Sequence, residues 1–271
     1  IPCGYRGSSC FITSTSDKNE LCSNPYDHIH ITMTYTALVS LLILGDDLSR
    51  VNRQAIISTM KYLQLDNGSF VASVLSSESD LRFIYCACCI SYLLDDWSGI
   101  NTDTCTDYIK NCLTYEGAFG QVPGAEAHGG STFCAIASLY LMNRLHDVVH
   151  DKKQSQLVQW LLNRQSEGFN GRPNKPDDSC YSFWIGATLK MLNAFDFIDV
   201  EKNLDFLHST ENSITGGFSK WPNSSADPLH SYLSLAALSL MSNPSLNELH
   251  PALIVSQNRI KYLKNELHSK W

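Results

Sequence analysis

The sequence has few charged residues, no long apolar run and no excess of basic side chains. Only 17% of its 271 residues are charged, and the formal charge at pH 7 is −7. A nucleic-acid-binding protein needs clustered Lys and Arg to displace counterions from phosphate, so the balance argues against that class. A membrane-spanning helix needs about 20 consecutive apolar residues. The best run, Ala37 to Leu44, is shorter and contains Ser40, so we expect no membrane span.

The ten cysteines lack the pattern of a metal-binding ribbon, because there is no pair of C-x-x-C motifs. Several lie inside apolar runs such as Tyr85 to Ile90. We expect small buried thiols in a reducing compartment, and hence a cytoplasmic protein. We expect no secretory signal at the start of the chain. Its first residue is Ile1 rather than Met, which we interpret as a cut or processed start.

A Gly-Phe motif recurs about every fifty residues. Its phenylalanines are Phe70, Phe119, Phe169 and Phe218, spaced by 49, 50 and 49 residues. An amphipathic segment precedes the motif, and a more apolar segment follows it. The amphipathic segments include Gln54 to Gln64, Asp107 to Thr114 and Gln154 to Gln165. The apolar segments are Thr32 to Leu44, Phe83 to Leu94, Ser131 to Leu145, Tyr181 to Phe195 and Ser231 to Met241.

This alternation predicts an all-α fold, an α/α toroid of concentric inner and outer helices. A helix with one polar face lies outside, whereas a helix that is apolar all round is buried. The glycines suit turns that need a positive φ. An ordinary helical solenoid without a cavity has the same periodicity and remains the alternative. We see no strand-like alternation and no linker, so residues 1–271 are predicted to form a single domain.

Polar residues recur at fixed distances after each repeat phenylalanine. Equivalent positions of a closed ring face a common centre, so distant residues are expected to converge. Nine residues on are Ser79, His128, Asp178 and Asp227; twelve on are Arg82, Ser131, Tyr181 and His230; fifteen on are Tyr85, Cys134, Trp184 and Leu233.

Asp178, Cys180 and His230 form a candidate zinc site. Zinc takes carboxylate, thiolate and imidazole ligands, and catalytic sites use three of them plus one open position. The alternative, for each residue taken alone, is that Cys180 is a buried thiol and His230 a core histidine.

A candidate anion site lies close by in the sequence. Arg172 and Lys175 are two cations three residues apart in a turn, which suits a diphosphate. The run His128-Gly129-Gly130 adds a donor and a helix N-terminus. A solvated loop and a capped glycine turn are the alternatives.

Together these segments resemble the β subunits of protein prenyltransferases over essentially the whole chain. The resemblance rests on His128-Gly129-Gly130, Gly171 to Lys175, Asp178 to Trp184, and Gly216 to His230. It implies an α/α barrel with a lipid cavity and a helical-repeat α subunit as partner. Gly217 to Pro222 and Asp227 to Tyr232 most resemble the type I geranylgeranyltransferase branch. That branch transfers a geranylgeranyl group from geranylgeranyl diphosphate to the cysteine of C-terminal CaaX proteins, such as small GTPases, with X often Leu.

The resemblance implies a role for each matching residue. Asp178, Cys180 and His230 would bind one Zn²⁺. Lys220 would replace the magnesium ion that assists farnesyltransferases, so Mg²⁺ is not expected to be required. The remaining roles fall to His128, Arg172, Lys175 and Tyr181 for the diphosphate; Arg82, Tyr85 and Trp184 for the lipid and peptide cavity; His30, Glu78 and Arg82 for the peptide carboxylate, through water; and Leu229 for the last peptide residue.

Alternatives within the family differ at single positions. The farnesyltransferase β subunit carries an aspartate where Lys220 stands and a tyrosine where Leu229 stands, and the Rab branch has two tryptophans at Phe183-Trp184. The family also has an N-terminal region with a lipid-length determinant, and this chain is expected to begin after it.

Three other classes of protein compete with this reading. A toroid glycosidase needs two catalytic carboxylates, and the candidates Asp46-Asp47 and Asp95-Asp96 look like helix ends. A cyclising terpene enzyme needs an Asp-x-Asp-Asp motif, which the sequence does not contain. A noncatalytic toroid scaffold would leave both the zinc set and the diphosphate set without a use.

Overall fold

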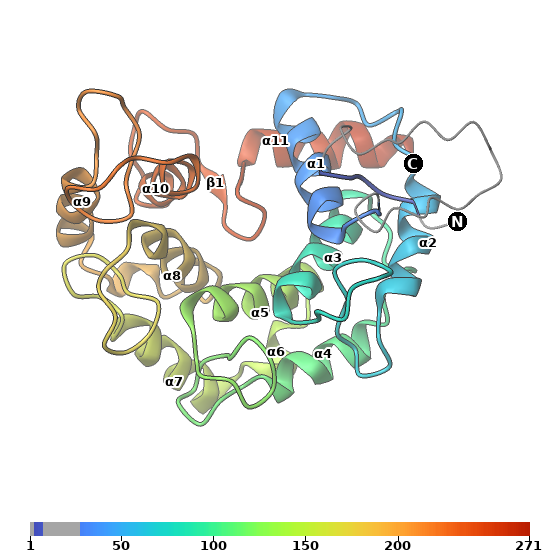
Figure 1. Cartoon of the computed structure of the whole chain (residues 1–271), viewed down its shortest axis with the longest axis horizontal. Coiled ribbons are helices and arrows are strands. Elements are labelled where there is room, and N and C mark those ends of the chain that lie inside the picture. The colour runs from blue at the N-terminus through green and yellow to red at the C-terminus, as the bar shows by residue number, and fades with distance from the viewer. Residues whose placement is uncertain (1–2, 8–27) are drawn as a thin grey trace.

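The computed structural model describes residues 3–7 and 28–271. Five apolar helices follow one another in an arc around the centre of the molecule (Figure 1). Each contacts the next along the arc. They are α1 (Ile31–Leu44), α3 (Leu81–Leu93), α5 (Gly129–Leu141), α8 (Ser179–Met191) and α10 (Pro228–Leu240). Two of the ten cysteines, Cys10 and Cys22, lie outside the described residues.

Four amphipathic helices lie outside this arc and bury one face each (Figure 1). They are α2 (Arg53–Leu63), α4 (Thr102–Asn111), α7 (Asp151–Leu162) and α9 (Val200–Ser209). Two short helices, α6 (Leu145–Val148) and the 3-10 turn η2 (Phe195–Phe197), follow inner helices. The predicted all-α toroid of inner and outer helices is confirmed, whereas the single domain of residues 1–271 stays a prediction.

The recurring position nine residues after each phenylalanine is the N-cap of an inner helix. His128, Asp178 and Asp227 each accept a hydrogen bond from a backbone N–H of the first turn of α5, α8 and α10. In α3 the cap is Asp80 rather than Ser79. The inner helices begin side by side, since Asp178 and His230 of neighbouring helices are in contact. The N-caps therefore gather chemistry at one end of the ring.

Glycine is required in the turns that precede these caps. Gly68 and Gly117 both have φ of +91°, a conformation that disfavours other residues. A Cβ on Gly68 would lie 2.0 Å from the backbone oxygen of Thr104. The turn is therefore fixed both by its own dihedral angle, as the sequence predicted, and by the close approach of α4, which it did not predict.

The C-terminal segment contains the one short sheet among the described residues, which the sequence analysis did not predict. Strands β1 (Leu249–His250) and β2 (Val255–Ser256) pair antiparallel. They have two residues each, too few for a visible alternation. Three more turns follow: α11 (Gln257–Tyr262), the π-helical η3 (Leu263–Leu267) and the 3-10 η4 (His268–Lys270).

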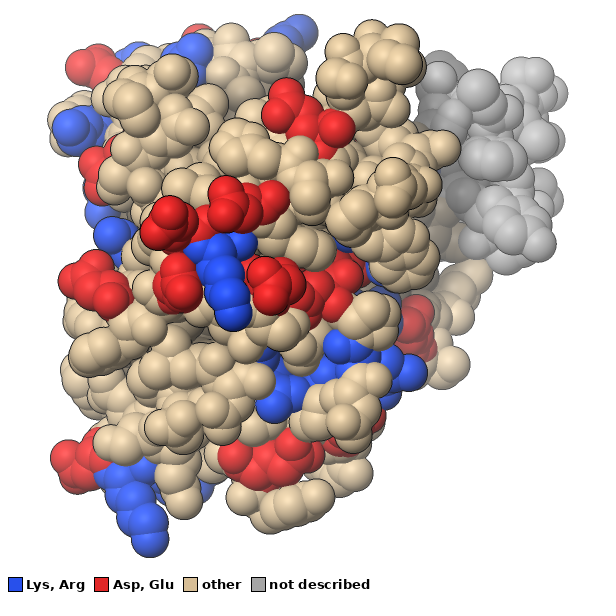
Figure 2. All heavy atoms as spheres, turned by 90° about the vertical axis from the view of Figure 1, so that its left-hand side faces the viewer, with Lys and Arg blue, Asp and Glu red and all other residues tan. Residues whose placement is uncertain are grey.

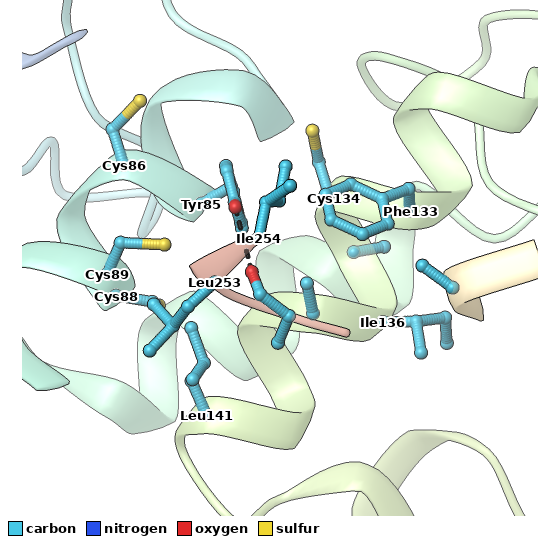
Figure 3. Packing of buried hydrophobic residues seen from close by; sticks show 14 of the residues in the cluster. Tyr85, Cys86, Cys88, Cys89, Phe133, Cys134, Ile136, Leu141, Leu253 and Ile254 are labelled. Carbon is cyan, nitrogen blue, oxygen red and sulfur yellow. Dashed lines mark hydrogen bonds between the residues drawn. The ribbon is translucent and has the colours of Figure 1, made fainter. Parts of the chain in front are cut away.

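The tip of this hairpin inserts among the inner helices (Figure 3). Leu253 and Ile254 are buried next to Tyr85 of α3 and Phe133 of α5. The hydroxyl of Tyr85 donates to the carbonyl oxygen of Ala252 across 2.8 Å, shown as a dashed line in Figure 3. The segment also connects the two ends of the arc, because β1 contacts α10 and β2 contacts α1.

All eight described cysteines are free, and all but Cys3 are buried. Burial raises the pKa of the Cys86, Cys105 and Cys112 thiols to about 12. These residues behave as small apolar side chains, as predicted. In the described part of the chain, no helix has the length and apolar character needed to cross a bilayer.

Candidate functional site

Asp178, Cys180 and His230 come together although they belong to two different helices. Asp178 caps α8, Cys180 lies in the first turn of α8, and His230 lies in the first turn of α10. One potential ligand atom from each lies within 4.8 Å of the others. Asp178 Oδ1 is 3.3 Å from His230 Nε2. Neighbouring inner helices thus bring together a thiol, an imidazole and a carboxylate.

The helix caps also orient the imidazole of His230. Asp227 Oδ1 accepts the backbone N–H of His230 at 3.0 Å, and Asp227 Oδ2 lies 2.5 Å from His230 Nδ1. Nε2 is therefore the nitrogen that faces Asp178. When a histidine binds a metal through one ring nitrogen, a carboxylate that contacts the other nitrogen fixes the orientation of the ring and raises its basicity. Sequence analysis noted Asp227 only as an equivalent position and missed this contact.

The thiol of Cys180 lies in a site that keeps it protonated without a cation. Burial first, and then the charge of Asp178, raise the pKa of Cys180. Oxygen, nitrogen and sulfur donors at this spacing suit a divalent transition metal, whose charge would replace the thiol proton. The residues present therefore fit a metal ion.

A pocket of about 270 Å³ adjoins the three ligands and shares Asp178 with them. Its charged and hydrogen-bonding side chains come from the N-caps of α5 and α8, the first turn of α8 and the loops that precede α8 and α10. They are His128, Arg172, Lys175, Asp178, Tyr181 and Lys220, with Gly171, Pro176 and Trp221 completing the wall. Arg172 and Lys175, which are predicted to bind the diphosphate, thus line one pocket with Lys220, which is predicted to replace magnesium.

The cations of this pocket differ in their surroundings. Arg172 Nη1 donates to Glu126 Oε2 at 2.6 Å. Lys220 Nζ lies 3.7 Å from Asp178 Oδ2. Lys175 has no ion-pair partner within residues 3–7 and 28–271. The sequence did not predict the contact between Arg172 and Glu126, because nothing in the residues around Glu126 distinguishes it from other acidic residues in loops.

Tyr181 and His128 form a hydrogen-bonded pair beside these cations. His128 Nδ1 accepts the backbone N–H of Gly130 at 3.1 Å, so the proton of a neutral ring lies on Nε2. Burial, and then the charge of Arg172, lower the pKa of His128, which keeps the ring neutral at pH 7. Nε2–H therefore donates to the hydroxyl oxygen of Tyr181, 2.9 Å away. The tyrosine O–H is left as a donor.

Trp184 and Tyr85 belong to an aromatic row on the inner helices. The ring centroid of Trp184 is 4.8 Å from that of Phe133, which is 5.3 Å from that of Tyr85. Tyr85 continues the row to Tyr35 of α1 through a 3.1 Å contact between the two hydroxyls. The row follows the wall of the ring away from the metal ligands.

His30, Glu78 and Arg82 gather at the start of α1 and α3, apart from the metal ligands. Arg82 donates to Glu78 and, at 2.7 Å, to the buried carboxylate of Asp80. His30 caps α1. Burial lowers the pKa of His30, and the charge of Glu78 opposes this shift. Leu229 precedes His230 and is 55% exposed. The structure thus places the predicted residues in three groups: the metal ligands with the basic pocket, the aromatic row, and the residues at the start of α1 and α3.

The molecular surface carries no broad basic area on the face shown in Figure 2. Lys and Arg lie among Asp and Glu there, and uncharged residues cover most of the view.

Comparisons with known proteins place these features in a family. The family model described as prenyltransferase alpha-alpha toroid domain matches residues 2–255. The geranylgeranyl transferase type-1 subunit beta of Dictyostelium discoideum is 45% identical over 264 residues, which cover 94% of this chain and 74% of that protein. The same subunit of Arabidopsis thaliana is 43% identical over 233 residues, which cover 83% of this chain and 62% of that protein.

A solved structure agrees with the sequence comparisons. The protein geranylgeranyltransferase-I of Candida albicans complexed with GGPP superposes with a TM-score of 0.83 at 32% sequence identity. The match covers 89% of this chain and 76% of that chain.

Proposed function

The chain belongs to the prenyltransferase α/α-toroid family, and we propose that it is the catalytic β subunit of a type I protein geranylgeranyltransferase. It transfers the geranylgeranyl group of geranylgeranyl diphosphate to the cysteine of a C-terminal CaaX sequence, and diphosphate leaves. One observation carries the proposal: three metal-ligating side chains share Asp178 with a pocket lined by Arg172, Lys175 and Lys220. A thiol acceptor and a diphosphate leaving group need such neighbouring sites.

Asp178, Cys180 and His230 would hold a zinc ion, for which three protein ligands of this chemistry leave a fourth position open. When bound, zinc would hold the acceptor cysteine as a thiolate at that position. Asp227 keeps the ring of His230 oriented. The chain's own contribution here is to fix the place at which the nucleophilic sulfur lies.

The basic pocket stabilises the charge that grows on the departing diphosphate. Arg172 and Lys175 supply charged donors, and Tyr181 supplies an O–H that His128 orients. Donors fixed in advance act most strongly where charge develops during the reaction. Lys220 adds a positive charge 3.7 Å from Asp178 Oδ2. Because of this charge, we expect magnesium to be unnecessary.

The lipid and the peptide bind along the inner helices. Trp184 is the partly exposed end of the aromatic row and offers an apolar surface, on which each buried CH₂ of a prenyl chain contributes about 0.8 kcal/mol. Leu229 and Trp184 contact the peptide end, and the group of His30, Glu78 and Arg82 holds its terminal carboxylate through water. The partner is a helical-repeat α subunit, and the acceptors are CaaX proteins such as small GTPases. The free buried cysteines support a cytoplasmic setting.

The competing functions leave features without a use. The farnesyl and Rab branches are disfavoured by the 45% and 43% identity to type-1 β subunits. For a glycosidase, Asp46 and Asp47 are poorly placed, because each accepts a backbone N–H within its own turn. A noncatalytic scaffold leaves the metal ligands and the basic pocket unexplained.

The test is prenyl transfer by the chain co-purified with an α subunit. We expect geranylgeranyl diphosphate and a peptide ending in Leu to be the preferred pair, and EDTA-inactivated enzyme to recover with zinc alone. Preference for farnesyl diphosphate with a peptide ending in Ser or Met would refute the branch. Recovery that needs magnesium would refute the role of Lys220. Unchanged metal content and turnover in Cys180→Ser would favour the scaffold.

A further inference from the structure

One cation of the basic pocket is held by a carboxylate that does not line that pocket. Arg172 Nη1 donates to Glu126 Oε2 across 2.6 Å. Arg172 borders the basic pocket, whereas Glu126 borders a neighbouring pocket of about 350 Å³ together with Tyr115 and Gly124. Glu126 therefore contacts the guanidinium without itself lining the basic pocket.

Among the described residues, neither lysine of the pocket pairs with a carboxylate from outside the site. Lys220 lies near Asp178 itself, a candidate metal ligand. Lys175 has no carboxylate within ion-pair distance in the described part of the chain. A lysine is a mobile point charge, whereas arginine carries five donors in one rigid plane. Fixing one edge of that plane orients every remaining donor.

We propose that Glu126 is a positioning residue, which holds the guanidinium of Arg172 in the orientation that receives the diphosphate. The proposal rests on the proposed function, since it takes the basic pocket to be the diphosphate site. Glu126 lies two residues before His128, whose ring orients the hydroxyl of Tyr181. A single loop thus prepares two of the donors before the ligand arrives.

Positioning and simple charge predict opposite effects of removing Glu126. A carboxylate close to an anion site repels the anion, so charge alone predicts tighter binding once it is removed. Positioning predicts weaker binding, because a loose arginine loses side-chain freedom each time the anion binds. The sign of the change therefore separates the two.

The experiment measures the affinity for inorganic pyrophosphate by calorimetry, using the full chain assembled with its α subunit. Glu126→Ala should weaken pyrophosphate binding about three- to ten-fold without changing the melting temperature. Glu126→Gln keeps an acceptor for Arg172, so its affinity should lie between those of Glu126→Ala and the unsubstituted protein. Unchanged or tighter binding in Glu126→Ala would overturn the proposal.

Asp103→Ala is the matched control. Asp103 accepts from Arg144 Nη1 at the same distance of 2.6 Å, and Arg144 follows the end of α5 that lies opposite His128. Its removal should leave pyrophosphate affinity unchanged. An equal weakening in this control would assign the effect to general charge or stability and overturn the proposal.

A double substitution tests whether Glu126 acts through Arg172. Glu126→Ala should have no further effect in an Arg172→Ala background, and a persisting effect would contradict positioning. Arg172→Ala alone distinguishes the two levels of inference. If it leaves pyrophosphate affinity unchanged, the diphosphate site fails and the proposed function with it. If it weakens binding while Glu126→Ala does not, only the role of Glu126 fails.

Discussion

Asp227 contacts His230 twice, once at the backbone nitrogen and once at Nδ1 of the ring. We expect Asp227→Asn to keep the cap, since asparagine caps helices as well as aspartate, but to lose the charged contact with the ring. Metal affinity should fall about 10- to 100-fold, as measured by competition with a chromogenic chelator. Asp199→Asn, at the cap of outer helix α9, should leave metal affinity unchanged. Equal losses in both variants would refute the orienting role.

We expect the hydroxyl of Tyr181 to donate to the departing diphosphate. Burial raises the pKa of its hydroxyl, so the group stays neutral and donates. Tyr181→Phe should reduce kcat about 10- to 100-fold, the usual effect of losing a hydrogen bond to a charged group. Single-turnover kinetics would measure it, and Tyr62→Phe on the exposed face of α2 is the control. A normal rate in Tyr181→Phe would remove it from the reaction.

Metal binding itself should depend on pH through Cys180. Its thiol has a raised pKa because of burial and of Asp178, so binding must release the thiol proton below that pKa. Affinity should therefore rise about tenfold per pH unit for this one proton. In Cys180→Asp the proton is already lost at neutral pH, so the slope should flatten. An equal slope in both proteins would contradict proton release from Cys180.

The sequence predicted the metal-binding residues from their ligand chemistry and their place in the repeat, and it missed contacts between side chains. Asp178 and His230 stand nine and twelve residues after repeat phenylalanines, and Cys180 lies two residues after Asp178. The structure brings the three within 4.8 Å of one another. Glu126 and the second contact of Asp227 depend on which side chain lies across a gap. Such pairings are set by three-dimensional packing and leave no local signal.

The sequence predicted which helices are inner and which are outer, but not the residues at which they begin. The inner helix predicted from Tyr181 begins at Ser179, because Asp178 caps the chain before the apolar run starts. The outer helix predicted from Asp107 begins at Thr102, where the side chain of Asn101 accepts two backbone N–H groups. Periodicity reports the buried face, whereas capping side chains decide where the helix starts.

The C-terminal hairpin should respond to acid through His250. Burial, and then Lys264, lower the pKa of His250 to about 4, and its Nδ1 accepts the backbone N–H of Leu253. The unfolded chain takes up this proton near pH 6.5. Stability should therefore fall between about pH 6.5 and pH 4, by roughly 3 kcal/mol for this group. Urea unfolding of His250→Gln should show a shallower pH dependence, and an unchanged slope would exclude His250.

For the molecule as a whole, the fifty-residue repeat predicted the ring but not how its ends meet. Residues 245–271 lie beyond the last repeat, so their packing had no template in the sequence. The structure places them from α10 across to α1 (Figure 1), with Leu253 fully buried.

Leu253→Ala should destabilise the whole ring. Removing a buried leucine side chain usually costs about 2 to 5 kcal/mol, and here the loss falls where the hairpin meets inner helices. The urea midpoint should fall in a single transition. Leu44→Ala, at a position that is 80% exposed, should change it little. A separate early transition would mean that the hairpin unfolds on its own.

The bond between Tyr85 and Ala252 spans 167 residues, and this separation matters while the protein is being made. Ribosomes add about 5 to 20 residues per second, so α3 leaves the ribosome about ten to thirty seconds before the hairpin that covers it. During that interval the apolar wall of Tyr85, Phe133 and their neighbours has no cover from its own chain. Until the hairpin of β1 and β2 has been made, this wall is exposed apolar surface of the kind through which partly folded chains aggregate.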